Sequence, residues 1–416
     1  MTFADTTHKT DALTPDMVSM AEGAHAAARL AVLRLVVTGF RNYGRAAMAL
    51  DARPVVLVGE NGAGKTNILE ALSFLTPGRG LRGVRLSDVS TRDMSRDEAG
   101  QTTQPWGVAA TVMTPDGTVD LGTGIGRTSD GDKRVVKVDG AAKSGSGVLG
   151  QFVRALWLTP QMDRLFIEGA GGRRRFLDRM VLGFDAGHSS RVSSYEKAMR
   201  ERTRLLAEDN WNASWLSALE GQMAEHGVAI ALARTHLIGQ LKAAIAEHEG
   251  PSDTAFPKAQ VALASGFSDE VDALLGSAAS VDVEDAYAAR LKSARGRDAA
   301  AGRALEGPHR ADMLVRHAPK NMDAQACSTG EQKALLIGLV LANARLHCAS
   351  FGAPPLLLLD EVAAHLDARR RTALFNELER LGAQAWMTGT DASLFENLGD
   401  RAQLFNVAHG EITPQA

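Results

Sequence analysis

The 416-residue sequence predicts an α/β fold in which a mainly helical lobe is inserted between the two halves of one core domain. Two observations lead to this prediction. Short β-rich runs alternate with helical patterns near both ends of the chain, and a long helical stretch separates them. The expected core strands are residues 31–37, 55–58, 155–158, 356–359 and 385–387, and the helical stretch covers 172–250 and 268–300.

The first half of the core follows this order along the chain. The run 31–37 and the strand 55–58 lead into a glycine-rich turn, after which residues 66–72 carry apolar side chains at helical spacing. Between residues 107 and 140, alternating apolar and polar positions are interrupted by Gly and Asp. This alternation predicts short antiparallel strands.

The inserted stretch contains two tryptophans, Trp211 and Trp215, four residues apart on one helical face. We interpret them as core anchors rather than as a platform for stacking nucleic-acid bases. A strand is expected at 260–263, where the helical pattern is interrupted. The stretch lacks heptad repeats, so a long coiled-coil arm is not expected.

These patterns divide the chain into four parts. A polar tail over residues 1–28 is expected to be disordered, because it has too little apolar surface to bury. The core occupies residues 29–165 and 301–416, and the helical lobe occupies residues 166–300. A helix is expected over residues 333–345 in the second half of the core.

The composition excludes several classes of protein. Forty-six basic and forty-nine acidic residues give a net charge of −3, so any contact with DNA or RNA must come from local basic patches. Two cysteines in 416 residues argue against a disulfide-stabilised secreted fold and favour the reducing cytoplasm. The sequence has no apolar run of the roughly 18–20 residues that a membrane span requires, so no membrane association is expected.

The strongest functional signal is the glycine-rich run between the second strand and the following helix. It consists of Gly59, Glu60, Asn61, Gly62, Ala63, Gly64, Lys65 and Thr66. Glycines at this spacing let backbone N–H groups approach phosphate oxygens, and the helix N-terminus adds its positive end. Lys65 is expected to bridge the β- and γ-phosphates of ATP, and the Thr66 hydroxyl to ligate Mg²⁺. A glycine-rich turn with a chance lysine is the alternative.

A second signal is the strand 356–359, which is followed directly by Asp360 and Glu361. Four leucines predict a strand buried on both faces, and ligands of α/β sheets bind beyond the carboxyl ends of the strands. Asp360 is expected to hold Mg²⁺, directly or through water, and Glu361 to orient or deprotonate the attacking water. An ordinary solvated strand end is the alternative interpretation of these two carboxylates.

The third signal precedes the helix expected at 333–345. Ser328 or Thr329 can cap this helix, and with Gly330 they form an anion site suited to a γ-phosphate. A simple helix cap, without any ligand, is the alternative.

Basic residues gather at two places. The first group is Arg173, Arg174, Arg175, Arg179, Lys197, Arg200, Arg202 and Arg204 in the helical stretch, and the second is Arg369, Arg370 and Arg371. Clustering of this kind suits contacts with the DNA backbone, whereas a solvated helix face is equally compatible with each single residue. The second group fits a protein interface or helix solvation better.

Several motifs together resemble the RecF family of DNA repair proteins, which is a family of ABC-type ATPase heads of the SMC class. The resemblance extends over most of residues 31–410. The segments that carry it are 40–43, 59–67, 75–82, 172–178, 307–310, 328–332, 356–361 and 365–367.

This resemblance implies an ATP-dependent homodimer of weak ATPase activity that binds single- and double-stranded DNA through backbone contacts. It implies recombinase loading at gaps or junctions during recombinational repair and replication restart, with RecO- and RecR-type partners. Ser328 of one copy would face the γ-phosphate held by Lys65 of the other. The resemblance assigns nucleotide contacts also to Asn67, Gly330 and Asp367, and a Mg²⁺ and water contact to Gln161.

One position departs from the family pattern of ABC heads. After the strand 385–387 such heads commonly carry a histidine that contacts the γ-phosphate, whereas this chain has Thr390 near that place. Two other functions share some of the motifs, namely the ATPase subunit of a membrane transporter and a P-loop kinase. The helical insertion and residues 307–310 do not suit a transporter subunit, and a kinase has no use for residues 328–330.

Overall fold

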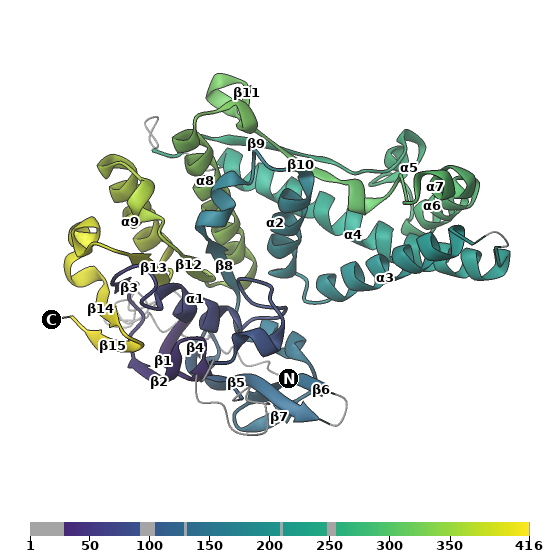
Figure 1. Ribbon diagram of the computed structural model, residues 1–416. Coiled ribbons are helices and arrows are strands. Elements are labelled where there is room, and N and C mark those ends of the chain that lie inside the picture. The colour runs from purple at the N-terminus through teal and green to yellow at the C-terminus, as the bar shows by residue number, and fades with distance from the viewer. Residues whose placement is uncertain (1–28, 92–104, 129–130, 209–210, 248–254, 416) are drawn as a thin grey trace, which may run out of the picture.

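The computed structural model describes residues 29–91, 105–128, 131–208, 211–247 and 255–415. The expected disordered tail at 1–28 lies outside these residues. In the described part, two six-stranded sheets and their helices form a head, and a helical lobe projects from it (Figure 1). The proposed boundaries at residues 165 and 300 stay a prediction.

The first sheet is mainly parallel and contains the strands that end at the predicted site. Its order is β15-β14-β3-β13-β12-β8, and only β15 runs antiparallel to its neighbour. The strands are β3 (Val55–Val58), β8 (Ala155–Leu158), β12 (Leu356–Leu359), β13 (Ala385–Gly389), β14 (Gln403–Ala408) and β15 (Glu411–Pro414). Every residue of β3, β12 and β13 is buried, as the uninterrupted apolar sequences of β3 and β12 predict.

The second sheet is antiparallel and confirms the alternation seen between residues 107 and 140. Its order is β2-β1-β4-β5-β6-β7. The strands are β1 (Ala31–Phe40), β2 (Tyr43–Ala49), β4 (Gly107–Thr114), β5 (Gly117–Thr128), β6 (Gly131–Val138) and β7 (Ala141–Lys143).

Alternate residues of the parallel strands belong to two apolar cores. Val55, Leu57 and Leu358 pack toward α1 (Lys65–Ser73) and the antiparallel sheet. Val56 and Leu359 pack on the opposite face, toward the helices α2 (Ala170–Leu182), α8 (Thr329–Phe351) and α9 (Ala368–Leu381). The period of two along a strand therefore fixes which layer each side chain joins.

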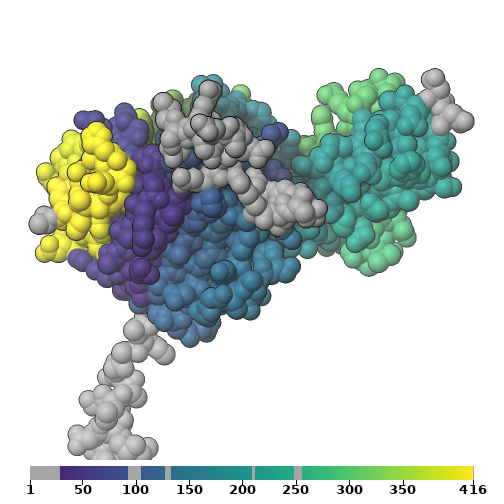
Figure 2. Space-filling model, turned by 60° about the horizontal axis from the view of Figure 1, so that its bottom comes forward, coloured from purple at the N-terminus to yellow at the C-terminus, as the bar shows by residue number. Residues whose placement is uncertain are grey.

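The projecting lobe is built mainly from α3 (His188–Leu206), α4 (Ala213–Glu247), α5 (Asp269–Leu274), α6 (Ser280–Ser293) and α7 (Arg295–Ala301). The 35-residue helix α4 joins the two parts of the molecule, because Leu216 and Met223 pack in the lobe core whereas Leu237 and Leu241 pack in the head core. Figure 2 shows the lobe as a separate mass beside the head. A small sheet of order β11-β10-β9 combines β9 (Ala259–Ala264), β10 (Asp312–His317) and β11 (Met322–Asp323).

Two sequence interpretations need correction. Trp211 and Trp215 are not core anchors, because they are 37% and 47% exposed; Trp211 precedes α4, and Trp215 lies in its first turn on a face exposed to solvent. The helices α4 and α8 are also long and apolar enough to span a membrane by length and composition, which the lack of an uninterrupted apolar run did not predict. Such helices are weak support for a span, and 61% of the apolar window of α8 is buried inside the head.

Candidate nucleotide-binding site

The glycine-rich turn connects the end of β3 to the start of α1, as the sequence predicts. Gly62 and Gly64 have φ angles of 84° and 118°, which favour glycine. A Cβ at Gly64 would lie 2.5 Å from Nδ2 of Asn42, so only glycine fits this approach. The turn therefore presents its backbone to the space beyond the sheet edge.

Lys65 is folded back over this turn. Its Nζ donates hydrogen bonds to the carbonyl oxygens of Gly59 at 2.6 Å and Glu60 at 2.8 Å. Burial lowers the pKa of Lys65, and the charges of Glu361 and Asp360 oppose this shift. The ammonium is thus placed between the turn and two carboxylates, where it can exchange its carbonyl partners for phosphate oxygens.

Asp360 is the central acceptor of the site. Its Oδ1 accepts hydrogen bonds from the hydroxyl of Thr66 at 2.8 Å and from the hydroxyl of Thr388 at 2.8 Å. The side chain is buried at the carboxyl end of β12, while its backbone N–H donates to the carbonyl of Leu158 in β8. The Thr66–Asp360 pair brings together two residues that the sequence assigned to Mg²⁺.

Glu361 has a left-handed backbone conformation, with φ of 52°. This conformation costs about 1–3 kcal/mol for a non-glycine residue, and such residues cluster at functional sites. The backbone N–H of Glu361 donates to the Thr388 hydroxyl at 2.8 Å, which holds the turn in place. The half-buried side chain leaves the sheet edge next to Asp360, where a water-activating carboxylate is expected.

Thr388 was missed by the sequence analysis, which considered Thr390 instead. Thr388 is fully buried in β13 and contacts both acidic residues, whereas Thr390 is exposed. The place of Thr388 in the sheet could have indicated its role. Because β13 pairs with both β3 and β12, a polar residue at the carboxyl end of β13 lies between the glycine-rich turn and the two acidic residues. A threonine in the run Trp386–Met387–Thr388 could have been recognised as the polar exception in a buried strand.

The outer side of α1 is clamped by residues of the segments that carry the family resemblance. Arg41 and Arg82 both pair with the buried Glu70, at 2.7 and 2.5 Å. Asn67 donates to Oδ1 of Asn42 at 2.7 Å, and Asn42 donates to the carbonyl of Ala63 at 2.9 Å. Asn67 therefore supports the glycine turn, and Glu70 is a second residue that the sequence analysis did not single out.

Ser328 caps α8, as one of the two expected capping residues. Its hydroxyl accepts from the N–H of Glu331 at 3.4 Å, and the Glu331 carboxylate accepts from the N–H of Ser328 at 3.0 Å. Hydrogen bonds from Lys320 and Ser328 lower the pKa of Glu331 to about 2. Ser328 and Thr329 are exposed, and among the described residues no hydrogen bond joins Ser328 to the glycine turn.

Asp367 is connected to the start of α8 by the side chain of Arg370. Asp367 caps α9 by accepting from the N–H of Arg370 at 2.8 Å and is itself exposed. The Arg370 guanidinium donates to the carbonyl of Gly330 at 3.0 Å. The structure thus places Ser328, Gly330 and Asp367 on one connected surface, separate from the hydrogen bonds around Lys65.

Gln161 lies in the turn that follows β8 (η4, Pro160–Arg164). Because Leu158 pairs with Leu359 of β12, this turn leaves the sheet at the same edge as Asp360. Gln161 is exposed, and among the described residues its side chain makes no hydrogen bond to Asp360, Thr66 or Lys65. Its assigned role remains a prediction.

The structure divides the basic cluster of the helical stretch into members with internal partners and exposed members, and it corrects both interpretations for Arg202, which faces neither DNA nor solvent. Arg202 is completely buried and pairs with Glu220 and Asp298 at 3.0 and 2.7 Å. Arg173 pairs with Asp312 at 2.7 Å, and Arg174 donates to the carbonyl of Ala311. The members that remain exposed are Arg175, Lys197, Arg200 and Arg204.

The residues present fit an ATP molecule with one Mg²⁺. Among the described residues, no group of three or more His, Cys, Asp or Glu side chains could hold a metal. Mg²⁺ usually retains waters and is held by one or two protein oxygens together with substrate phosphates. The Thr66 hydroxyl and the Asp360 carboxylate, which lie 2.8 Å apart, provide this donor set.

Comparison with known proteins gives consistent results. Residues 31–413 match a family model described as RecF/RecN/SMC N terminal domain. The chain is 50% identical over 385 residues to the DNA replication and repair protein RecF of Agrobacterium fabrum, which covers 92% of this chain and 99% of that protein. It is also 50% identical over 384 residues to RecF of Rhizobium rhizogenes, with 92% and 98% covered.

Solved structures show the same fold. The recombination mediator protein RecF of the RecFOR pathway, in a complex described as RecF-ATPrS, has a TM-score of 0.79 at 21% identity and covers 94% of this chain and 100% of that chain. An Smc head domain from Pyrococcus furiosus has a TM-score of 0.51 at 15% identity, with 93% and 96% covered. The expected ABC-type head fold is thereby confirmed, and the chain belongs to the RecF family of DNA replication and repair proteins.

Proposed function

We propose that the protein is an ATP-dependent DNA-binding protein that acts as a homodimer in recombinational repair and replication restart. In this proposal, ATP joins two heads at DNA gaps or junctions, and slow hydrolysis releases them. The observation that carries the proposal is the separation of the site into two surfaces within one chain. Lys65, Thr66, Asp360 and Glu361 gather at one sheet edge, whereas the Ser328 surface is exposed and not bonded to them.

Within one chain, the nucleotide is held by the first surface. The backbone of residues 59–66 and Lys65 bind the phosphates, with Asn67 supporting the turn. Thr66 and Asp360 would hold Mg²⁺, which would supply charge neutralisation at the phosphates. Glu361 orients the attacking water and accepts its proton, and Gln161, in the turn after β8, would add a contact to the metal and to this water.

The partner copy supplies the second surface. The exposed N–H groups at the start of α8, with the Ser328 hydroxyl and the small Gly330, suit a γ-phosphate held by the other head. Asp367 lies beside them through Arg370 and would border the same interface. Hydrolysis by an isolated monomer is then slow, because half of each site is missing.

DNA binding is proposed to use backbone contacts. Positive charge for such contacts comes from exposed basic side chains, including Arg175, Lys197, Arg200 and Arg204. Contacts of this kind with phosphates do not depend on the base sequence of the DNA. The relatives are named DNA replication and repair proteins, and a solved relative is described as a recombination mediator in the RecFOR pathway. We extend these descriptions to this chain and propose that it promotes recombinase loading together with RecO- and RecR-type partners in the cytoplasm. The transporter alternative finds no support in the comparisons.

The test is sedimentation of a Glu361→Gln variant, which should bind ATP without hydrolysing it. We expect monomers without nucleotide, dimers with ATP, and dimers that remain with a gapped duplex. The matched control is the double variant Glu361→Gln with Ser328→Arg, which should bind ATP as a monomer. A protein that is monomeric under all conditions would contradict the proposal.

A further inference from the structure

A cavity of about 350 Å³ lies between the loop after α1, the end of β8, α2 and the middle of α8. None of the glycine-turn residues 59–66 lines it, nor do Asp360 and Glu361, so it is distinct from the nucleotide site. Gln161 borders it, which places it next to that site. The lining residues that matter here are Arg82, Trp157, Glu168, Arg175, Arg179 and Asn343.

Arg179 is the unusual residue of this cavity. Its guanidinium lies over the indole ring of Trp157, 3.5 Å from the centroid. Burial lowers its pKa to about 9, so it stays positively charged at neutral pH. Among the described residues no carboxylate pairs with it and no oxygen accepts its N–H groups; the C-terminal end of α2 offers only a partial negative charge. Arg179 is half-buried, and charges withdrawn from water are normally paired, so a counter-ion is expected.

Another half-buried arginine, Arg134, has acceptors for its guanidinium within the described structure. Burial lowers the pKa of Arg134 to about 10, and no carboxylate pairs with it in the described structure either. Its guanidinium, however, donates to the carbonyl oxygens of Phe74, Thr76 and Gly78. Arg179 lacks acceptors of this kind, so its N–H groups remain available to a ligand.

The other charges of the cavity do not neutralise Arg179. The guanidinium of Arg82 is occupied by Glu70 and Asn67. Glu168, the acidic residue of the lining, pairs with Arg164 at 3.2 Å. Arg175 is exposed and has no carboxylate partner among the described residues. The cavity therefore carries an excess of positive charge.

Asn343 of α8 gives a second, independent indication of a ligand. The side chain is completely buried, yet both Nδ2 and Oδ1 lack a hydrogen-bond partner in the described part of the chain. An unpaired buried amide costs about 1–3 kcal/mol, so a partner is expected. Because Asn343 lines the cavity, a ligand oxygen inside it could accept from Nδ2.

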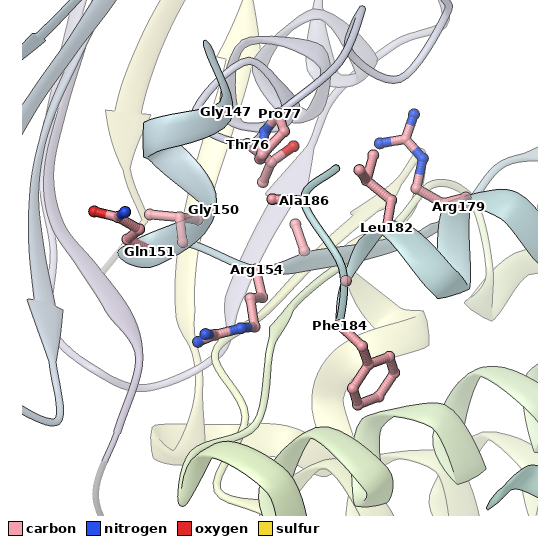
Figure 3. Close-up of a pocket in the computed structure, with 13 residues that line it drawn as sticks. Thr76, Pro77, Gly147, Gly150, Gln151, Arg154, Arg179, Leu182, Phe184 and Ala186 are labelled. Atoms are coloured by element: carbon pink, nitrogen blue, oxygen red, sulfur yellow. The ribbon is translucent and has the colours of Figure 1, made fainter. Parts of the chain in front are cut away.

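A neighbouring cavity of about 200 Å³ is bordered by Arg179 as well, together with Arg154, but no unpartnered buried amide lines it in the described structure. Figure 3 shows that the guanidinium groups of Arg154 and Arg179 point away from each other there. Arg154 lies 3.5 Å from the centroid of the Phe351 ring, which mirrors the stacking of Arg179 on Trp157. Arg154 is therefore a matched control: a stacked arginine outside the larger cavity.

We propose that the larger cavity binds a phosphate group carried by DNA, with the guanidinium groups of Arg179 and Arg175 and the amide of Asn343 as donors. The fork of an arginine suits phosphate oxygens, and the charge excess favours an anion. The inference rests on the proposed DNA binding and assigns one contact site for it. It also links bound DNA to Gln161, which lines the same cavity.

The first test measures the affinity for duplex DNA as a function of salt, with a saturating non-hydrolysable ATP analogue. We expect Arg179→Gln to weaken binding about 10-fold and to reduce the slope of log K against log salt by about 1. Arg154→Gln should change neither quantity, and both variants should bind the nucleotide as the unmodified protein does. Equal affinities and slopes for Arg179→Gln and the unmodified protein would overturn the proposal. Absence of DNA binding by the unmodified protein would instead contradict the proposed function.

The second test localises the ligand and identifies its source. DNA should change the tryptophan fluorescence of the unmodified protein, and Trp157→Phe should remove most of this change. A change with DNA but not with inorganic phosphate assigns the site to DNA-borne phosphate, and a change with both assigns it to a phosphate group from either source. A fluorescence change that is identical in Trp157→Phe would overturn the proposal, because the ligand would then lie elsewhere.

Discussion

The glycine turn at residues 59–66 and the start of α8 at residues 328–330 differ in the contacts that stabilise each of them within one chain. Thr66 bonds to Asp360 across 294 positions of sequence, so the first surface is assembled by the tertiary fold. Among the described residues, the side chain of Ser328 bonds only to Glu331, three residues away, and it stays exposed. The first surface is thus preorganised for a nucleotide. The second surface is a locally capped helix end, which among the described residues has no hydrogen bond to the nucleotide-binding residues of its own chain. The difference supports assembly between two copies.

The largest effect is expected on ATP binding, when the first surface loses the positive charge of Lys65. Lys65→Ala should weaken ATP binding by about 4 kcal/mol, or roughly 1,000-fold, because a partly buried charge contact with the phosphates is removed. Titration with a fluorescent ATP analogue measures the affinity. A variant that binds ATP normally would show that Lys65 remains on its carbonyl partners when the nucleotide is bound.

The second surface should respond differently. Ser328→Arg should leave ATP binding by the monomer intact but weaken ATP-dependent dimerisation by about 3 kcal/mol, roughly 100-fold, since a new cation would oppose Lys65 of the other copy. Sedimentation equilibrium with and without ATP measures this, and Ser328→Thr, which keeps the cap, is the control. Loss of ATP binding in the Ser328→Arg monomer would place both surfaces on one nucleotide within a chain.

Thr388 tests the preorganisation of the first surface. Thr388→Val removes a donor to Asp360 and leaves the N–H of Glu361 unpaired, which costs about 2 kcal/mol. We expect kcat for ATP hydrolysis to fall roughly 30-fold with little change in KM, and Thr388→Ser to restore it. Equal loss of activity in both variants would show that the hydroxyl does not position the carboxylates.

The smallest effect on ATP-dependent dimerisation is expected for a substitution at the far end of α8. His347 is buried with both ring nitrogens unpartnered, and burial lowers its pKa to about 3. The unfolded chain therefore takes up a proton near pH 6.5 that the folded chain resists. Stability contributed by the neutral ring is complete above pH 6.5 and is lost as the pH falls from 6.5 toward 3.

His347→Phe should reduce this acid sensitivity by about 3 kcal/mol at pH 4, as measured by chemical denaturation at pH 7 and pH 4. The aromatic replacement preserves stacking on Phe184 and loses no hydrogen bond. ATP-dependent dimerisation at pH 7 should be unchanged. A dimerisation defect would show that the body of α8, and not only its exposed end, determines the second surface.

Local patterns predicted much of the fold and the site. The buried strands at 55–58 and 356–359, the glycine turn and the Ser328 cap depend on residues that are close in sequence, so spacing was sufficient. The predictions that were wrong concern side chains whose surroundings come from distant elements. Arg202 became an internal ion-pair residue because Glu220 and Asp298 converge on it, and Trp215 remained exposed because no element covers its helix face in the described structure.

By itself, the sequence determined the α/β order, the phosphate-binding turn and the family, because periodicity, glycine spacing and capping are local properties of the chain. Only the tertiary structure decided that Thr388 contacts both acidic residues. Among the described residues, it alone also decided that no hydrogen bond joins Lys65 to Ser328 and that Arg179 has no carboxylate partner. Such facts depend on which strands are neighbours and on which charges meet across long sequence separations. Sequence spacing carries no information about those distances until the sheets and helices are packed.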